Sequence, residues 1–515
     1  MKTDMNVGLF LTRRAQRNSN QPFINDLFAK QRLSFSQVNE RANQLTHALE
    51  SRGLRHGDRV AILAHNGHQF VESFFGPAKS GYVIMPLNWR LTADELAFIL
   101  QDGGASALIF DEAFSSVVEQ LHSRGEEGVS VRHWIGIGQN PPAFATPYEE
   151  LLEGQPSEEP STLAEAHDNL FIMYTSGTTG LPKGVVHTHE GMFWAVINLL
   201  SSSDNQASDR YLIVLPMFHI AALGPMIGAT YRANALTIMC EADPSKIWET
   251  IYREQITTTL CVPALLNFML QVPALREFDH SSVRCILAGA APVPEATIRA
   301  YIDLGIRIDQ AYGLTENCGC GCLLTGPDAL ERVGSTGKAF MHTEVRVVDE
   351  SGKDQPPNEP GEVIIRGRHV MKEYWNRPDA TAETLRDGWL YTGDIATADE
   401  DGFVTICDRK KDMIISGGEN VYPAEVEAVL LQMDGVADAA VIGEPSERWG
   451  ESPLAVIVRG NPDLSDNAIL EHCNGRLARF KQPARVLFTD AIPRNPSGKI
   501  LKRVLRETLL EVASG

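Results

Sequence analysis

The segment Tyr174-Thr-Ser-Gly-Thr-Thr-Gly-Leu-Pro-Lys-Gly184 directly follows an apolar run, 171–174, that predicts a buried strand. Its glycines allow the backbone to close around an anion, while its free N–H groups, its hydroxyls and Lys183 supply donors and charge. A surface linker is the alternative, but linkers rarely follow a buried strand and end in Pro-Lys-Gly. We therefore predict a phosphate-binding loop, which is not a Walker A loop because Pro182 precedes the lysine. Its candidate residues are Thr175, Ser176, Gly177, Thr178, Thr179, Gly180 and Lys183.

Strand and helix signals alternate on the N-terminal side of this loop. Ser36 begins an amphipathic helix pattern, and Thr92-Ala-Asp-Glu95 is a capping box that opens a helix through Leu100. Because strands that alternate with helices form parallel sheets covered on both faces, we predict an α/β fold. Asn140–Leu163 is rich in Pro, Glu and Ser and is interpreted as a connector. Short apolar runs predict strands over Arg59–Leu63, Tyr82–Met85 and Ala105–Phe110.

The C-terminal part of the chain changes character. Glu344–Val348 and Glu362–Arg366 flank a turn rich in Gly and Pro and predict a β-hairpin. After Asp408 a compact run is long enough to be a small α/β domain of its own. Its signals are a short strand at 412–415, a helix from Ala424, strands near 439–442 and 454–458, and a final helix.

Composition limits the classes of function. The 515 residues carry 46 Lys and Arg against 66 Asp and Glu, a formal net charge of −20. This acidity argues against a nucleic-acid partner, because binding a phosphate backbone needs a basic surface. Eight scattered cysteines are typical of a reducing compartment. With no signal-peptide pattern, and with its most apolar stretch, Ile220–Thr230, too short to cross a bilayer, we expect a cytoplasmic protein without an integral membrane segment.

Four further segments follow the loop in order: Gln310-Ala-Tyr-Gly-Leu-Thr-Glu316, Tyr391-Thr-Gly-Asp394, the run Asp408–Asn420, and Pro496-Ser-Gly-Lys499. With the loop, they resemble the signature segments of the acyl-adenylate-forming (AMP-binding) superfamily, which includes acyl-CoA synthetases. The resemblance spans nearly the whole chain. It implies a large N-terminal domain, 1–408, of doubly wound sheets and a small β-barrel that holds ATP, Mg²⁺ and the acyl group. It also implies a small, mobile α+β C-terminal lid domain, 409–515.

This resemblance implies a reaction in two halves. A carboxylate attacks the α-phosphorus of ATP and pyrophosphate leaves; the thiol of coenzyme A then attacks the acyl-adenylate and AMP leaves. Both steps concentrate negative charge, so catalysis is mostly positioning and electrostatic stabilisation. The expected activity is that of an AMP-forming acyl-CoA synthetase, an acid–thiol ligase, whose expected partners are a small carboxylic acid, ATP and CoA.

The resemblance also implies roles for residues around the nucleotide. The phosphate loop would hold the leaving phosphates, and Thr315 would contact the α-phosphate. Glu316, with Thr315 beside it, would bind Mg²⁺, a hard cation that prefers oxygen ligands. Asp394 would accept hydrogen bonds from the ribose hydroxyls, supported by Arg409. The expected adenine slot, where small residues let the backbone approach a flat base, comprises Gly289, Ala290, Ala291, Gln310, Ala311, Tyr312 and Gly313.

Lys499 is the expected catalytic lysine of the lid, because its ammonium would bridge the substrate carboxylate and the nucleotide. Lys411 falls at the expected hinge, about which the lid would swing after adenylation. That motion would withdraw Lys499 and bring Gly418 to line a pantetheine tunnel. Trp449 and Phe480 are expected CoA contacts, with burial in the core as the alternative.

Pro216–Leu223 resembles the segment that lines the acid pocket of this superfamily. His219 would act at the carboxylate end, although a lone histidine on an apolar stretch is more often a core residue. A pocket lined by small apolar side chains accepts hydrophobic bulk. The resemblance favours a medium- or long-chain fatty acid, with an aryl or phenylpropenoate (feruloyl-type) acid as the alternative. The expected pocket residues are His219, Ala221, Ala222, Leu223 and Gly319.

Several alternatives stay open. The enzyme could pass the acyl group to a carrier protein or an amine instead of CoA. Cys318-Gly-Cys-Gly-Cys322 supplies three thiols where structural zinc needs four ligands, so pocket lining is favoured over a metal site, and His187-Thr-His189 shows no partner cluster in the sequence. Leu9–Arg17 offers a weak peripheral membrane contact, although an ordinary surface helix is favoured at this net charge. A homodimer is also left open.

Overall fold

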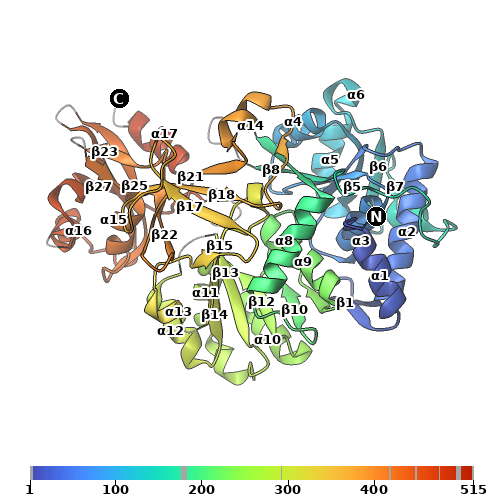
Figure 1. Ribbon diagram of the computed structural model, residues 1–515, viewed down its shortest axis with the longest axis horizontal. Helices are drawn as coiled ribbons and strands as arrows, with labels where there is room; N and C mark the ends of the chain where they lie inside the picture. The colour runs from blue at the N-terminus through green and yellow to red at the C-terminus, as the bar shows by residue number, and fades with distance from the viewer. Residues whose placement is uncertain are drawn as a thin grey trace. The chain divides into compact units, whose positions relative to one another are not determined.

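The computed structural model describes residues 4–175, 182–290, 293–326, 328–416, 419–446, 449–474, 476–494 and 500–512. The chain forms two compact units (Figure 1). One comprises Met1–Val333, Gly337–Val345 and Ile365–Leu390, and the other Gly334–Thr336, Arg346–Ile364 and Tyr391–Gly515. The architecture is mixed α/β, with a large N-terminal part of sheets and helices and a smaller C-terminal part, as predicted. The proposed boundary at residue 408 stays a prediction.

An eight-stranded sheet contains the strand that leads into the phosphate loop. Its strands in spatial order are β19 (Glu373–Tyr374), β9 (Lys183–Thr188), β8 (Asn169–Thr175), β4 (Val83–Pro86), β3 (Arg59–Leu63), β5 (Ala105–Asp111), β6 (His133–Ile137) and β7 (Thr146–Pro147). The strands from β8 to β7 pair in parallel, whereas β9 is antiparallel to both β8 and β19. The three strands predicted before the loop are confirmed as β3, β4 and β5, with β4 shifted by one residue.

A nine-stranded sheet carries the Gln310–Glu316 segment. Its strands in spatial order are β16 (Lys338–Ala339), β15 (Cys322–Leu324), β14 (Arg307–Tyr312), β13 (Cys285–Gly289), β12 (Thr258–Cys261), β10 (Arg210–Ile213), β11 (Ala235–Ile238), β1 (Pro22–Asp26) and β2 (Gln31–Ser34). The central strands from β14 to β1 are parallel. The carboxyl ends of β13 and β14 therefore lie side by side.

Helices connect and cover these strands. The predicted capping box at Thr92–Glu95 is present, and the helix expected from Ser36 begins at Phe35, where Ser34 and Gln37 form a second capping box. The helices of this unit are α1 (Leu9–Arg17), α2 (Phe35–Ser51), α3 (His68–Lys79), α4 (Ala93–Gly103), α5 (Ser115–His122), α6 (Gly125–Gly128), α7 (Tyr148–Leu152), α8 (His189–Ser202), α9 (Ile220–Arg232), α10 (Pro244–Glu254), α11 (Pro263–Leu270), α12 (Glu295–Asp303), α13 (Asp328–Glu331) and α14 (Pro378–Thr384), with 3-10 turns η1 (Glu112–Phe114), η2 (Pro273–Glu277) and η3 (Thr315–Asn317).

The interpretation of Asn140–Leu163 as a plain connector is wrong. This stretch contains β7 and α7, and Tyr148, Leu151 and Leu152 of α7 are buried in a core cluster. The composition of this stretch, rich in Pro, Glu and Ser, obscured a short apolar stripe. That stripe is sufficient for one helical turn, because its side chains pack against the neighbouring sheet.

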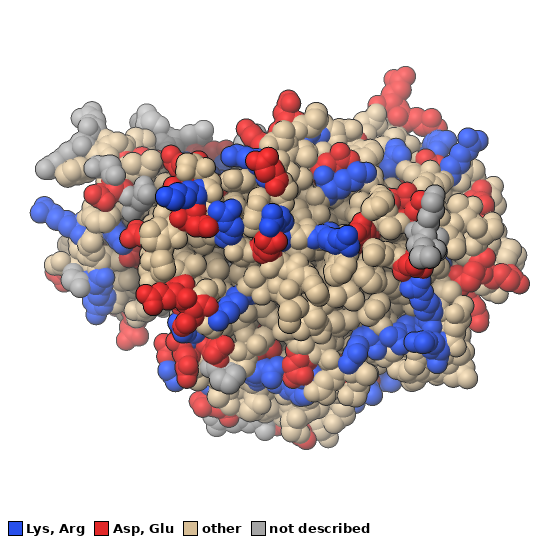
Figure 2. Space-filling view, viewed as in Figure 1, with Lys and Arg blue, Asp and Glu red and all other residues tan. Residues whose placement is uncertain are grey.

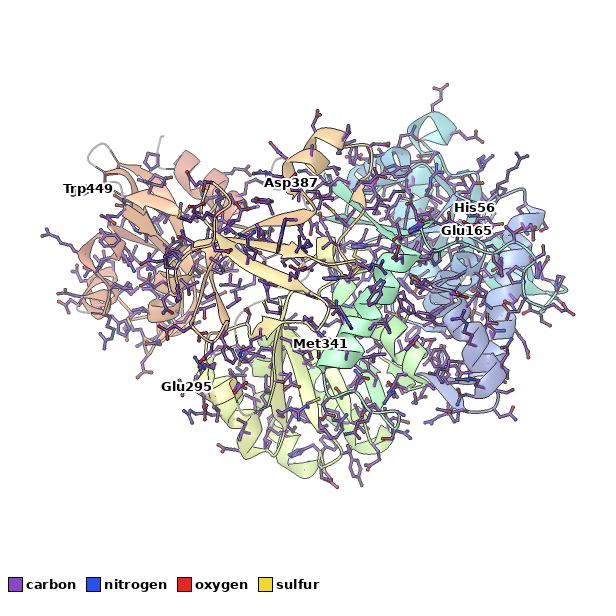
Figure 3. All side chains as sticks on the ribbon, viewed as in Figure 1. His56, Glu165, Glu295, Met341, Asp387 and Trp449 are labelled. Carbon is purple, nitrogen blue, oxygen red and sulfur yellow. The ribbon has the colours of Figure 1, made fainter. Side chains whose placement is uncertain are left out.

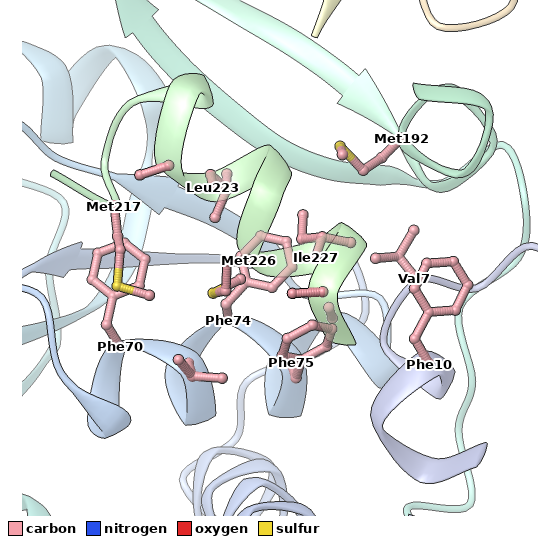
Figure 4. Close-up of a cluster of buried hydrophobic side chains, with 14 of the residues drawn as sticks. Val7, Phe10, Phe70, Phe74, Phe75, Met192, Met217, Leu223, Met226 and Ile227 are labelled. Carbon is pink, nitrogen blue, oxygen red and sulfur yellow. The ribbon is translucent and has the colours of Figure 1, made fainter. Parts of the chain in front are cut away.

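One core cluster takes side chains from both large sheets and from α1, α2, α3, α8 and α9. These helices therefore form a layer between the sheets. Figure 4 shows its centre, where Phe70, Phe74 and Phe75 of α3 meet Leu223 and Met226 of α9. Burying each of these side chains contributes about 1.5–3 kcal/mol, so this layer holds the sheets in a fixed relation.

A five-stranded sheet contains strands from the residue ranges of both units, and the predicted hairpin is confirmed as neighbouring strands β17 and β18. Its strands are β17 (Glu344–Val348), β18 (Gly361–Arg366), β21 (Trp389–Ala398) and β20 (Leu385–Arg386), with β22 (Val404–Arg409) paired to β21. A second five-stranded sheet has the order β24 (Glu419–Val421), β23 (Ile414–Ser416), β26 (Gly450–Arg459) and β25 (Val436–Ser446), with β27 (Arg485–Thr489) paired to β26. The helices of the second unit are α15 (Pro423–Leu430), α16 (Asp466–Cys473) and α17 (Lys502–Val512), with the 3-10 turn η4 (Arg479–Lys481). The sequence patterns missed β24, α16 and β27.

Charges of both signs are mixed on the face shown in Figure 2. Within the described ranges, no helix has both the length and the apolar composition to cross a membrane. The apolar residues Phe10 and Leu11 of α1 are buried in the core rather than presented at the surface. A peripheral membrane contact through this helix stays a prediction.

Candidate active site

The two ends of the phosphate loop are paired with each other. Thr175, the last residue of β8, lies opposite Lys183, the first residue of β9, and the Trp375 N–H donates to the Gly184 carbonyl over 2.7 Å. The two strands that flank the loop are therefore paired with each other as antiparallel neighbours. The remaining candidates of the loop, Ser176, Gly177, Thr178, Thr179 and Gly180, lie outside the described residues.

Thr315 and Glu316 are the first two residues of the turn η3, which follows the end of β14 after two intervening residues. The Tyr374 hydroxyl donates to Glu316 Oε1 over 2.8 Å, and the Met371 N–H donates to the Glu316 carbonyl over 2.7 Å. Lys183 Nζ lies 5.1 Å from the centroid of the Tyr374 ring. The structure thus brings the lysine of the phosphate loop and the carboxylate predicted to bind Mg²⁺ to the same tyrosine.

The carbonyl of this turn is held from β9. His187 Nε2 lies 2.7 Å from the Thr315 carbonyl oxygen. Burial lowers the pKa of His187 to about 4, so the ring is neutral near pH 7. A neutral ring facing a carbonyl carries its proton on the nitrogen that faces it, and Nε2 therefore donates.

Several residues of the expected adenine slot lie opposite one another on the paired strands β13 and β14. Gly289 at the end of β13 lies opposite Ala311 in β14, and Ala288 lies opposite Gln310. A Cβ at Gly289 would come within 3.2 Å of the Ala311 carbonyl oxygen, so the two backbones leave little room for a side chain there. Ala290 adopts a left-handed φ of +73°, and Ala291 lies outside the described residues.

In the loop after Tyr312, the backbone at Gly313 also approaches another backbone segment closely. A Cβ at Gly313 would lie 2.3 Å from the carbonyl carbon of Gly319. At Gly319 itself, φ is +78° and an added Cβ would meet no atom within 4 Å. Gly313 is thus required by a close backbone approach, and Gly319 borders open space.

The residues present fit a magnesium–nucleotide complex. Gln310 Nε2 is buried and has no hydrogen-bond partner among the described residues, which leaves a donor that a bound base would satisfy. A carboxylate at Glu316 next to a hydroxyl at Thr315 supplies the oxygen ligands that Mg²⁺ prefers.

The acid-pocket candidates lie at the start of α9. His219 precedes the first turn, and its carbonyl accepts from the N–H groups of Ala222 and Leu223. Burial, with a smaller effect of Arg90, lowers the pKa of His219 to about 4, and its Nε2 has no partner in the described part of the chain. Ala221 is half-buried, whereas Ala222 and Leu223 pack in the core cluster between the sheets. Their roles toward an acid stay predictions.

In the other unit, strand pairing brings together the two residues expected at the ribose. Asp394 and Arg409 are opposite each other on β21 and β22, and Arg409 Nε lies 2.6 Å from Asp394 Oδ1. Lys411 is the second residue after β22, and burial lowers its pKa. Trp449, labelled in Figure 3, is 47% exposed and Phe480 is 38% exposed, so neither is a core residue. Gly418 and Lys499 lie outside the described residues.

Sequence reasoning missed Tyr374 and set His187 aside. Side chains at 183, 185 and 187 share one face of β9, and Tyr374 is paired with Val185 on that face. The alternation from Lys183 would have placed His187 on the same face of the strand as the loop lysine. No local signal identifies Tyr374, because its position depends on a pairing with a strand almost 190 residues earlier in the chain.

The cysteine run does not form a metal site in the described residues. All eight cysteines are free, and Cys318, Cys320 and Cys322 are buried. Across the described ranges, no three His, Cys, Asp or Glu side chains come together in a way that could hold a metal ion.

The chain is similar to known proteins over nearly its whole length. The chain matches the AMP-binding enzyme family over residues 11–375 and the AMP-binding enzyme C-terminal domain over 425–499. It is 44% identical over 502 residues to the long-chain-fatty-acid–CoA ligase FadD13 of Mycobacterium tuberculosis, with 98% of each chain covered. It is 39% identical over 476 residues to a feruloyl-CoA synthase of an Amycolatopsis species, covering 92% of this chain and 93% of that one.

A solved structure extends the comparison. The anthranilate CoA ligase AuaEII in complex with anthranoyl-AMP matches with a TM-score of 0.92 at 28% identity, over 99% of this chain and 98% of that one. The matches cover the phosphate loop, the η3 turn and the small C-terminal part. With a family match over most of its length and relatives this similar, the chain belongs to the AMP-binding enzyme family.

Proposed function

We propose that this protein is an AMP-forming acyl-CoA ligase that activates a hydrophobic carboxylic acid through an acyl-AMP intermediate. The observation that carries the proposal is the meeting of Lys183, Tyr374 and the Thr315–Glu316 turn, which follows the strand β14 that holds adenine-slot candidates. It supports the proposal because adenylation requires groups for phosphate, metal and base close together, and these are the residues expected to supply them.

In the first half-reaction the protein binds and orients ATP. The phosphate loop and Lys183 hold the β- and γ-phosphates, and Thr315 donates to the α-phosphate. Glu316 would hold Mg²⁺, which when bound shields the phosphate charge. An acid oxygen then attacks the α-phosphorus, the bond to pyrophosphate breaks, and pyrophosphate leaves with its electron pair. His219, neutral near pH 7, would stand beside the acid carboxylate.

Lys499 would neutralise the carboxylate and nucleotide during this attack. In the second half-reaction the CoA sulfur attacks the acyl carbon and AMP leaves. For this step we propose that the lid turns about Lys411, so that Gly418 lines the path of the thiol and Trp449 and Phe480 contact CoA. Asp394, held by Arg409, would keep the ribose in both halves.

The proposed acid is a medium- or long-chain fatty acid, supported by the similarity to a long-chain-fatty-acid–CoA ligase and by the small side chains at the start of α9. The similarity to a feruloyl-CoA synthase supports a phenylpropenoate as the second candidate. We expect the protein to act in the cytoplasm, without a nucleic-acid partner.

A panel of fatty, aromatic and dicarboxylic acids tests this proposal. Each acid is incubated with ATP, Mg²⁺ and CoA, and thioesters are identified by mass spectrometry. Acyl-CoA from fatty acids is expected, with AMP and pyrophosphate as co-products. Without CoA, AMP release should stall at bound acyl-AMP. If no acid in the panel produces either acyl-AMP or a thioester, the proposed function is wrong.

The lid lysine separates the two half-reactions. Lys499→Ala should reduce adenylation by about 10²–10³-fold, the usual cost of losing one preorganised donor, and spare thioester formation from synthetic acyl-AMP. Equal loss of both half-reactions would contradict a lysine that acts only in the first.

A further inference from the structure

Two sequence features that the reaction leaves unused meet in the structure. His187 comes from the His187-Thr-His189 segment of β9, and Cys318 begins the cysteine run after η3. Cys318 Sγ lies 3.2 Å from His187 Nδ1, and both side chains are buried. They are 131 positions apart in the sequence, so only the fold brings them together.

The donor and acceptor in each of these hydrogen bonds can be assigned from the groups that flank the His187 ring. The Thr315 carbonyl can only accept, so His187 Nε2 carries the ring proton and donates to it. His187 Nδ1 then has a free lone pair, which accepts from the Cys318 thiol. The Cys318 N–H also donates to the same Thr315 carbonyl over 3.1 Å. Thiol, imidazole and carbonyl form a closed ring of contacts around the η3 turn.

The backbone at Cys318 is unusual for a residue with a side chain. Its φ is +53°, in the left-handed region that glycine adopts without strain. The preceding Asn317 already closes the turn, because its Oδ1 accepts hydrogen bonds from the N–H groups of Leu314 and Gly319. The turn therefore does not need a side chain at position 318. The contact of the Cys318 thiol with His187 gives a reason for a side chain at this strained position.

Strand β9 reaches both residues of the turn. Lys183 and His187 share a face of this strand with the paired Tyr374. From that face, His187 holds the carbonyl of Thr315, while Tyr374 holds the carboxylate of Glu316. The two residues expected to contact the α-phosphate and Mg²⁺ are thus held from one side by a single strand pair.

We propose that His187 and Cys318 are positioning residues, which hold the Thr315–Glu316 turn in the geometry that binds magnesium and the α-phosphate. This inference rests on the proposed function, since Thr315 and Glu316 have these roles only if the protein forms acyl-AMP. Partners that orient a metal ligand typically change metal affinity or activity by about 10–100-fold when they are removed.

Cys318→Gly separates positioning from folding. Glycine suits the left-handed backbone, so the loss of a buried side chain is offset by relief of strain and the fold is retained. The thiol donor is lost, however, and His187 is free to turn. Cys318→Ser keeps a donor of similar size. Asp387→Gly is the matched control, because Asp387 has a similar φ of +51° in an exposed turn between β20 and β21, where Figure 3 labels it.

The measurement is pyrophosphate exchange into ATP as a function of Mg²⁺ concentration, with a fatty acid present and thermal unfolding recorded in parallel. For Cys318→Gly we expect the Mg²⁺ concentration at half-maximal rate to rise about tenfold with an unfolding temperature close to that of the wild type. Cys318→Ser should restore most of the affinity, and Asp387→Gly should leave the Mg²⁺ curve unchanged.

Three results would overturn the inference while the wild type remains active. They are an unchanged Mg²⁺ curve for Cys318→Gly, a serine variant as impaired as the glycine variant, and an equal shift for Asp387→Gly. If Cys318→Gly does not fold, the comparison of Cys318→Ser with His187→Phe takes its place, because only the phenylalanine loses both hydrogen bonds. A wild type that shows no exchange with any acid would instead overturn the proposed function, and this inference with it.

Discussion

Gly313 gives a direct test of how the η3 turn is placed. It lies between Tyr312, the last residue of β14, and the turn that carries Thr315 and Glu316. In Gly313→Ala the new methyl group would lie 2.3 Å from both the carbonyl carbon and the carbonyl oxygen of Gly319 and 2.5 Å from its Cα. All three atoms belong to the backbone, so no side-chain rotation relieves the clash.

The size of the effect follows from that distance. A carbon contact of 2.3 Å must open by about 1 Å to reach an ordinary separation, and a shift of that size in a positioned group can cost about 10²-fold in rate. Overpacking of this kind also costs about 1–3 kcal/mol of stability. We therefore expect Gly313→Ala to fold but to lose about 10²-fold in kcat/KM for adenylation.

The assay is pyrophosphate exchange, with unfolding in urea measured on the same preparation. Gly305→Ala is the control, because Gly305 has a φ of +78° and no atom within 4 Å of an added Cβ, so it tests backbone strain without a clash. It should lose about 1 kcal/mol of stability and keep its exchange rate. Near-normal exchange in Gly313→Ala, or an equal loss in Gly305→Ala, would refute the view that this close approach places the turn.

Three further results are expected. Tyr374→Phe frees the Glu316 carboxylate and should raise the Mg²⁺ requirement of exchange about tenfold; an unchanged requirement would contradict its orienting role. Ala221→Trp should exclude bulky acids while ATP still binds, and an unaltered acid preference would remove this residue from the pocket. Burial lowers the pKa values of four histidines well below that of the unfolded chain, so protonation of the unfolded state should reduce stability as the pH falls below about 6.5, by about 1 kcal/mol each at pH 5.5. An unfolding midpoint in urea that stays constant from pH 7.5 to 5.5 would contradict this. These histidines are His187, His189, His219 and His369.

Local signals were sufficient for most of the N-terminal elements. The strand at Arg59–Leu63 and the capping box at Thr92 are as predicted, because apolar runs and capping side chains act within a few residues. The patterns failed where an element depends on its neighbours. Helix α7 was hidden in a polar stretch, and β27 is a half-buried strand whose place is set by its pairing with β26.

The candidate site divides in the same way. The loop was predicted from its residue types, since its glycines, hydroxyls and lysine have a direct chemical meaning, whereas the Tyr312–Glu316 segment was predicted through its resemblance to the superfamily. Tyr374 was missed because its position results from pairing with β9. His187 was noticed but given no role, because its partner Cys318 lies after η3, in the segment between two strands of the other large sheet, and the contact exists only after the chain folds.

The register of β8 against β9 is therefore a condition for the whole arrangement. The register shifts once, between Asn169 and Phe171, after which Phe171 to Thr175 pair one by one with His187 to Lys183. A slip of one residue would turn Lys183 and His187 to the opposite face of the sheet. The lysine would leave Tyr374, and the Thr315 carbonyl would lose its imidazole donor, in the same event. The phosphate loop and the metal-binding turn thus depend on one pairing, so a change at the distant end of the β8–β9 pair should impair both together.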